Sequence, residues 1–302
     1  MNVLVVARWT VLEARRRKLL LAGVVLSAAF VVLFALGFTL FYHLEERGLV
    51  NAQAQVTDPT SMGGMVGARE QLLVLSSALV ILGLYGVQFL AALLGLFLGV
   101  ASVSPEVDSG ALHAVLARPL SRLDYLLGRF LALAGMLTAY VVVMSGSLLL
   151  TARIVAGYEA GDTTRAVGLM ILQVLVLLAV SLLGSIVLPT LANGVVMLAL
   201  FGLAWLGGII EFIGTVPPGN DLMVNLGTAV SLLLPADAVW RGASYHVMPP
   251  SLLVASSFVD QGGAGLPFAS TAPMAPTMLA WALAYPAACI GLAVASFRRR
   301  DL

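Results

Sequence analysis

The side chains that could catalyse a reaction or bind a metal are few and widely separated in this chain of 302 residues. Its three histidines, His43, His113 and His246, show no H-E-x-x-H spacing, so no two of them can share a helix face as zinc ligands. Glu45 and Glu46 stand close to His43, but at the edge of an apolar run, where solvation accounts for them. The pattern does not indicate a metalloenzyme.

Nucleotide hydrolysis requires a glycine-rich loop whose lysine reaches the phosphates. The only lysine is Lys18, and no glycine run precedes it. The single cysteine, Cys289, lies within an apolar run, which excludes an intrachain disulfide and a site built from several cysteines. We therefore expect no enzyme activity and no cofactor in this chain, and we exclude a nucleotide-binding subunit.

Three polar side chains fall within apolar runs, where polar groups are costly and often functional. Gln88, Gln173 and Glu211 are therefore candidates for a pathway or a gate. Hydrogen bonding between helices is the alternative for the two glutamines. Hydration near the membrane surface is the alternative for Glu211.

The composition requires a membrane as the environment of these residues. Hydrophobic residues make up 60% of the chain and charged residues 10%, and the mean hydropathy is +1.02, whereas about a quarter of a soluble domain is charged. A helix needs about 20 apolar residues to cross the hydrocarbon. The windows that qualify are 19–42, 71–103, 126–151, 166–188, 195–216 and 277–297. We predict an all-α integral membrane protein with six transmembrane helices, multi-pass in the cell (inner or plasma) membrane.

Lysine and arginine are distributed unevenly across these spans, and an even number of crossings places both termini on one side. The termini and the polar island 104–125 carry Arg8, Arg15, Arg16, Arg17, Lys18, Arg118, Arg122, Arg129, Arg298, Arg299 and Arg300. The other side carries Arg47, Arg69, Arg153, Arg165 and Arg241. The positive-inside rule therefore predicts cytoplasmic termini and a cytoplasmic island. The net charge of +1 gives no indication of a nucleic-acid partner.

Two further segments flank the spans. Residues 1–18 predict an interfacial helix on the inner leaflet, which either anchors the topology or contacts a partner. In the external segment 217–276, the apolar runs Leu222–Leu234 and Ser251–Val259 are too short to cross. They predict short re-entrant or interfacial helices before the last span, with an external loop around a small apolar core as the alternative.

The cytoplasmic island, residues 104–125, contains strong helix signals. Ser104 suits an N-cap and Pro105 the first helical position, and Glu106 and Asp108 favour the positive end of the helix dipole. The residue before Pro119 is pushed out of the helical region, so we expect a helix of about three turns that ends by residue 118. The island is then either a rigid link between two spans or a solvated loop.

At the island the sequence resembles the cytoplasmic coupling segment of ABC-2 type transporter permeases. The resemblance rests on E-x-D-S-G-A-L from residue 106, R-P-L-S-R from residue 118 and Y-L-L-G-R from residue 125. The strings L-P-A-D-A at 234–238 and F-R-R-R-D-L at 297–302 are also similar to family patterns. Within the family, the chain resembles most the permeases of nitrous oxide reductase maturation and of drug export.

The resemblance implies a single permease domain over residues 1–302, embedded in membrane lipid. It further implies a second permease copy and two copies of a separate ABC ATPase subunit, which would bind ATP and Mg²⁺. The residues expected at the ATPase interface are Glu106, Asp108, Ser109, Gly110, His113, Arg118, Pro119 and Arg122.

Two functions remain open under this resemblance. The first is export of an amphipathic or hydrophobic substrate, driven by ATP hydrolysis in the partner subunit. The second is transmission of that motion, without transport, to an external partner protein on segment 217–276. A stand-alone secondary carrier would predict charged pairs at mid-membrane, and the predicted spans contain none.

Overall fold

The structure is a computed structural model that describes residues 3–16, 18–55, 62–108, 122–215, 219–251 and 267–299. These residues form helices and short connections, with no strand among them. The helices are α1 (Val3–Arg16), α2 (Lys18–Gln55), α3 (Met62–Asp108), α5 (Arg122–Ala156), α6 (Thr163–Val187), α7 (Thr190–Thr215), α8 (Asp221–Leu233), α9 (Ala236–Val247) and α11 (Pro276–Arg299).

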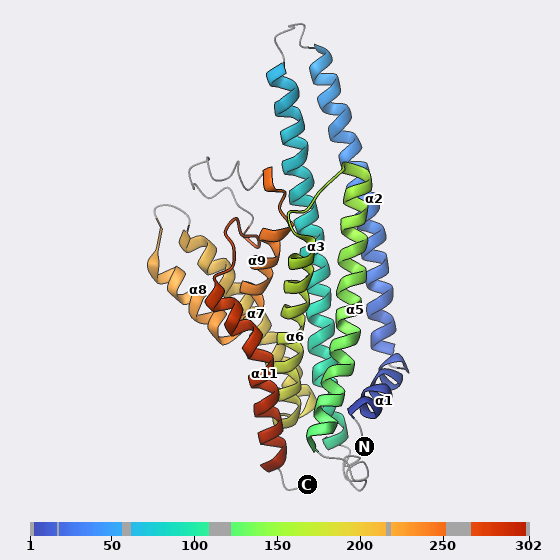
Figure 1. The fold of residues 1–302 in the computed structure, drawn as a ribbon, viewed down its shortest axis with the longest axis vertical. Helices are drawn as coiled ribbons and strands as arrows, with labels where there is room; N and C mark the ends of the chain where they lie inside the picture. Colours follow the sequence, from blue (N-terminus) through green and yellow to red (C-terminus); the bar gives the residue numbers. More distant parts are fainter. Residues whose placement is uncertain are drawn as a thin grey trace.

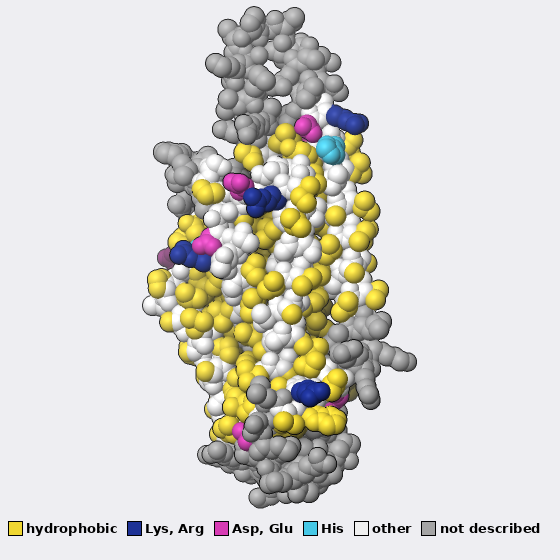
Figure 2. Space-filling model, turned by 45° about the vertical axis from the view of Figure 1, so that its right-hand side comes forward, with side chains coloured by type: hydrophobic (Ala, Val, Ile, Leu, Met, Phe, Trp, Pro, Cys, Tyr) yellow, Lys and Arg dark blue, Asp and Glu magenta, His cyan; other side chains and the backbone are white. Residues whose placement is uncertain are grey.

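Six of these helices are long and apolar enough to cross a membrane, which confirms the six-span, all-α prediction. The spans are Ala22–Gly48, Leu72–Val103, Leu123–Ala156, Thr163–Val187, Thr190–Thr215 and Pro276–Phe297. The two chain ends lie at the same end of the molecule, as six crossings require (Figure 1). Hydrophobic side chains cover most of the surface drawn in Figure 2, and charged side chains appear in its upper half and near its lower end. The protein is a multi-pass membrane protein.

Helix α6 is the centre of the bundle and α2 is peripheral. In α6, 67% of the span is buried, against 11% in α2. Helix α6 packs against α3, α5, α7, α9 and α11. Leu177, Leu178 and Leu182 of α6 are fully buried. The polar side chains of Gln173, Ser181 and Ser185 on α6 are therefore buried in protein rather than exposed to lipid.

The connection between α6 and α7 is shorter than the gap between the predicted windows 166–188 and 195–216. Helix α7 begins at Thr190, so Asn193 lies inside that helix. The Asn193 side chain is fully buried, and its Nδ2 donates to the carbonyl of Ser181 at 3.0 Å. This bond across the helix pair compensates for the low helix propensity of asparagine.

The predicted helix start at Ser104 is wrong. Helix α3 continues without a break through Ser104 and Pro105 to Asp108. Val103, directly before this site, is fully buried in the cluster around α5, α6 and α11. Extending a packed helix adds a hydrogen bond for most residues added, whereas starting a new one carries the cost of nucleation. The cap signals therefore lie within the last turns of a long helix.

Two short helices precede the last span, as predicted. Helices α8 and α9 meet at an angle of 103° across the break at Leu234 and Pro235. Helix α8 folds back along α7, where a Cβ on Gly207 would lie 2.6 Å from Val230. Of the second short run predicted in this segment, residues 252–259 lie outside the described part of the chain.

Two features at the ends of the molecule complete the fold. A helix, α1, occupies most of the segment 1–18, and its interfacial position stays a prediction. At the opposite end, α2 continues to Gln55 and α3 begins at Met62, so both extend beyond their spans and past the other helices (Figure 1). The sequence windows did not predict this outer extension, because its residues are too polar to be counted as membrane-spanning.

Candidate functional site

A cavity at mid-membrane brings together two of the three polar residues singled out from the sequence. Gln88 lies near the middle of the α3 span, and Gln173 lies on α6. Both line a cavity whose other walls are Tyr85, Phe89, Phe201, Ala204, Trp205, Asp237 and Trp240. These residues come from α3, α6, α7 and α9, so the site is formed only when four helices pack together.

The two glutamines present hydrogen-bond acceptors to this cavity. Gln88 is 1% exposed and Gln173 is 4% exposed. The Nε2 of Gln88 donates to the carbonyl of Met170 at 3.1 Å, which fixes the orientation of the amide. The Oε1 atoms of both glutamines have no hydrogen-bond partner among the described residues. A buried acceptor without a partner costs about 1–3 kcal/mol, so these atoms favour a ligand or water that donates to them.

Two N–H donors at the cavity wall are engaged with backbone carbonyls. One is the amide of Gln88, and the other is the indole of Trp240, which donates to the carbonyl of Phe268. The cavity therefore offers acceptors and aromatic faces to an occupant.

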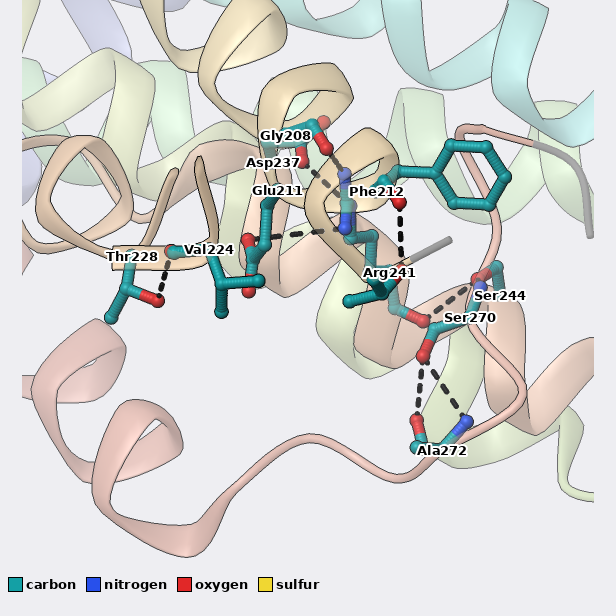
Figure 3. Close-up of polar contacts among 11 residues, drawn as sticks. Gly208, Glu211, Phe212, Val224, Thr228, Asp237, Arg241, Ser244, Ser270 and Ala272 are labelled. Atoms are coloured by element: carbon teal, nitrogen blue, oxygen red, sulfur yellow. Dashed lines mark hydrogen bonds and ion pairs between the residues drawn. The ribbon is translucent and has the colours of Figure 1, made fainter. Parts of the chain in front are cut away.

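An ion-pair cluster lies beside the cavity, between α7 and α9 (Figure 3). Arg241 Nε is 2.9 Å from Asp237 Oδ2, although the two groups are not aligned as a hydrogen bond. The Nη1 atom of Arg241 is 3.9 Å from Glu211 Oε2, and its Nη2 donates to the carbonyl of Gly208. The side chains of Asp237 and Arg241 are 9% and 15% exposed. Two carboxylates thus share one guanidinium.

Close approach of the two helices at this cluster depends on Gly208. A Cβ at this position would overlap Asp237 Oδ2 and would lie 2.8 Å from Arg241 Nη2. Any larger residue would displace the side chains of the ion pair, so the arrangement favours glycine at this position.

Residues that precede the last span are hydrogen-bonded to α9. The backbone N–H of Ser270 donates to Ser244 Oγ at 3.0 Å, and Ser244 Oγ donates to the carbonyl of Arg241 at 2.7 Å (Figure 3). The ring of Phe268 stacks on Tyr85 with centroids 4.8 Å apart. These contacts hold residues that precede the last span against α9 and against Tyr85, which lines the cavity.

At the outer end, α9 is also fixed to the connection between α5 and α6. The hydroxyl of Tyr158 donates to the carbonyl of Val247 at 2.8 Å, and the N–H of Asp162 donates to the carbonyl of His246 at 2.9 Å. Burial raises the pKa of the Tyr158 hydroxyl, which therefore stays protonated and able to donate.

At the end of the bundle that holds both chain ends, α1 packs closely on the start of α5. A Cβ on Gly128 would lie 2.7 Å from the Cβ of Val6, so only a glycine permits this contact. Arg129 Nη2 is 3.4 Å from Glu13 Oε2, and the guanidinium lies 5.1 Å from the centroid of the Tyr125 ring. Arg129 is 6% exposed; its contact with Glu13 joins α1 to α5, and its contact with Tyr125, on the same helix, holds the guanidinium in place.

A sequence model described as ABC-2 family transporter protein matches residues 5–302 of the chain. The chain belongs to the ABC-2 transporter family. It is a permease membrane subunit of that family, and such permeases generally pair with ABC ATPase subunits, in which the ATPase activity resides. No curated protein matches the chain.

The predicted coupling segment lies between the end of α3 and the start of α5. Ser109, Gly110, His113, Arg118 and Pro119 lie outside the described residues. Glu106 and Asp108 belong to the last turn of α3, and Arg122 is the first residue of α5. The role of all eight residues at an ATPase interface stays a prediction.

Sequence reasoning missed the part that α9 plays in this permease. Asp237 and Arg241 were assigned to an external segment, whereas both are largely buried against α7. Glu211 does not line the cavity with the glutamines, but its contact with Arg241 connects it to Asp237, which does line the cavity. The spacing of four residues between Asp237 and Arg241 was a signal, because it places the two charges on one helix face.

Proposed function

We propose that this permease couples ATP hydrolysis in a separate ABC ATPase subunit to the export of an amphipathic or hydrophobic substrate. Two permease copies and two ATPase copies form the transporter, and the translocation path lies between the permease copies. The ATPase binds the segment 104–125 through Glu106, Asp108 and Arg122, together with Ser109, Gly110, His113, Arg118 and Pro119.

The continuity of α3 is the observation that carries this proposal. One unbroken helix holds Glu106 and Asp108 at its inner end and Gln88 at mid-membrane. The 18 residues from Gln88 to Glu106 correspond to about 27 Å at 1.5 Å per residue. A push on the inner end of a continuous helix displaces the cavity wall, whereas a flexible loop would absorb it.

Because α6 lies at the centre of the bundle, a displacement of α3 reaches other helices through α6. Helix α3 packs along α6, and α6 contacts α9. A shift of α3 changes the distance between Gln88 and Gln173 across the cavity. It also strains the contacts through which α6 holds α9. The polar cluster of Asp237, Arg241 and Glu211 then acts as a gate, because its bonds join α9 to α7 on the outer side of that cavity.

Charge reversal at the coupling segment tests the proposal. Glu106→Lys and Arg122→Glu are expected to abolish co-purification of the ATPase or its stimulated turnover while membrane insertion stays intact. Arg47→Glu is the matched control, because Arg47 is exposed near the outer end of α2, on the opposite side of the membrane. Unchanged association and turnover in both coupling variants would reject the proposal.

The outer extension of α2 and α3 favours a second candidate function. These helix ends project beyond the remaining helices (Figure 1) and add an external surface to the segment 217–276. A transmitter that passes ATP-driven motion to an external protein, as in a maturation system, would use such a surface. Stable co-purification of an external partner supports transmission, while substrate uptake into inverted vesicles without a partner supports export.

A further inference from the structure

The occupant of the mid-membrane cavity can be inferred from what its walls offer. The acceptors Gln88 Oε1 and Gln173 Oε1 are buried and have no partner in the described part of the chain. One N–H group of Gln88 and the indole N–H of Trp240 are engaged with backbone carbonyls. An occupant that supplies hydrogen-bond donors therefore satisfies both amide oxygens, which an occupant with acceptors alone leaves unpaired.

Charge favours a cation among such donors. The adjacent cluster holds two carboxylates, Asp237 and Glu211, against the single guanidinium of Arg241, so its formal charge is negative. Asp237 lines the cavity, while Arg241 is not among the described residues that line it. Arg241 is instead directed toward the carbonyl of Gly208 on α7 (Figure 3). The cavity is thus closer to the carboxylate than to the compensating positive charge.

The aromatic wall favours the same occupant. Tyr85, Phe89, Phe201, Trp205 and Trp240 surround the amide oxygens. Aromatic faces attract cations, and the attraction strengthens where water is excluded. Amide oxygens, a carboxylate and several rings together match a protonated amine better than a neutral hydroxyl.

The size of the cavity and the exposure of its aromatic walls indicate the shape of a ligand that fits. The space open to water-sized groups is about 20 Å³, which accommodates one or two small polar groups, such as an ammonium head. Phe89 and Trp205 at the cavity are 45% and 43% exposed, whereas Trp240 is 1% exposed. The cavity therefore opens on the side of Phe89 and Trp205, where an alkyl chain can lie along the rings and continue into lipid.

We propose that this cavity binds the protonated head of an amphipathic alkylamine, with Gln88 and Gln173 accepting its N–H bonds and its chain directed past Phe89 and Trp205. This inference rests on the proposed export function, since it assigns that function a substrate class: amphipathic primary or secondary ammonium compounds. Binding precedes any movement of α3 and requires neither ATP nor the ATPase.

Hexylammonium is a suitable probe, because its short chain limits partitioning into lipid. The full-length permease in lipid nanodiscs is titrated with hexylammonium, and the fluorescence of Trp205 and Trp240 at the cavity reports binding. Hexanol supplies a neutral donor, and hexyltrimethylammonium supplies a cation without N–H groups. We expect saturable binding of hexylammonium at least about tenfold tighter than binding of either analogue, which is about 1.4 kcal/mol. Equal binding of the three compounds would overturn the proposal.

Substitutions locate the binding site. Gln88→Leu and Gln173→Leu are each expected to weaken hexylammonium binding about tenfold or more. Asn193→Ala is the matched control, because Asn193 is another fully buried amide whose Oδ1 has no partner among the described residues, but it lies in the first turn of α7, outside the cavity. Its affinity for hexylammonium is expected to match that of the unmodified permease.

Gln173→Glu covers the case in which the leucine variants do not fold. A further carboxylate at the cavity is expected to tighten hexylammonium binding and to leave hexanol binding unchanged. Weaker hexylammonium binding in this variant, or unchanged binding in folded leucine variants, would refute the site. Loss of ATPase association in the Glu106 and Arg122 variants with amine binding intact would refute only the proposed coupling, so the two failures are distinguishable.

Discussion

Removal of the guanidinium from the polar cluster between α7 and α9 gives the sharpest test of the packing described above. Arg241→Met keeps most of the aliphatic stem and deletes the charge. Asp237, whose side chain is 9% exposed, then loses its ion-pair partner at 2.9 Å. Removing one member of a buried pair typically costs about 3–5 kcal/mol, because the remaining charge is left in a medium of low dielectric constant.

Protonation of Asp237 limits that cost and makes it depend on pH. A carboxyl with an ordinary pKa of about 3.9 takes up a proton at pH 7 at a cost of about 4 kcal/mol, and at pH 5 at a cost of about 1.5 kcal/mol. The destabilisation by Arg241→Met therefore has an upper limit near these values and shrinks as the pH falls. At roughly 2 °C per kcal/mol, the melting temperature is lowered by roughly 8 °C at pH 7 and roughly 3 °C at pH 5.

Thermal unfolding of the purified permease, followed by tryptophan fluorescence, measures this effect. Two controls accompany it. Glu211→Gln removes a carboxylate that is 29% exposed and 3.9 Å from the guanidinium, so its cost is expected to stay below about 1 kcal/mol. The double variant Asp237→Leu with Arg241→Met removes both buried charges and is expected to recover most of the lost stability.

Two results would refute the reasoning. A loss of melting temperature that is the same at pH 5 and pH 7 would show that Asp237 is not left as an unpaired buried charge. A double variant as unstable as Arg241→Met alone would show that the aliphatic stem or the contact with Gly208, rather than the ion pair, holds α9 to α7.

Two further predictions concern close helix packing, and a third concerns one hydrogen bond. Gly208→Ala places a Cβ on the carboxylate of α9 and is expected to lower the melting temperature, whereas Gly202→Ala on the same helix meets no atom within 4 Å and is expected to be neutral or stabilising by up to about 1 kcal/mol. Gly128→Ala is expected to loosen the packing of α1 on α5, which is measured as faster proteolysis of α1 in membranes. A Cβ on Gly135 meets no atom within 4 Å, so Gly135→Ala is the control and is expected to leave the rate of proteolysis unchanged. Tyr158→Phe deletes the donor to the outer end of α9 and is expected to cost about 1 kcal/mol in thermal unfolding; a change below about 0.3 kcal/mol would contradict the assigned bond.

The membrane spans were predictable because the determinant is local. A run of about 20 apolar residues is sufficient for a crossing, and each predicted window coincides with a helix of the required length. The break at Pro235 was predictable for the same reason, since proline cannot continue a helix interior and α8 ends two residues before it. Family membership likewise follows from the sequence, through a match that extends over residues 5–302.

The site was only partly predictable. Gln88 and Gln173 were singled out one by one, because a polar side chain in an apolar span is costly wherever it lies. Their meeting in one cavity, from positions 85 residues apart, depends on how α3 and α6 pack. The roles of Asp237 and Arg241 depend on the 103° bend that turns α9 back onto the bundle.

The sequence by itself therefore determined which segments cross the membrane, how often, and to which family the chain belongs. Tertiary packing determines which polar groups face one another. It also accounts for the continuation of α3 through Ser104 and Pro105, where local signals indicated the start of a new helix. The physical reason is the range of the interactions. Hydrophobicity and proline sterics act on a segment and its immediate neighbours, whereas the partner of a buried charge or amide is fixed by helices that are distant in the chain.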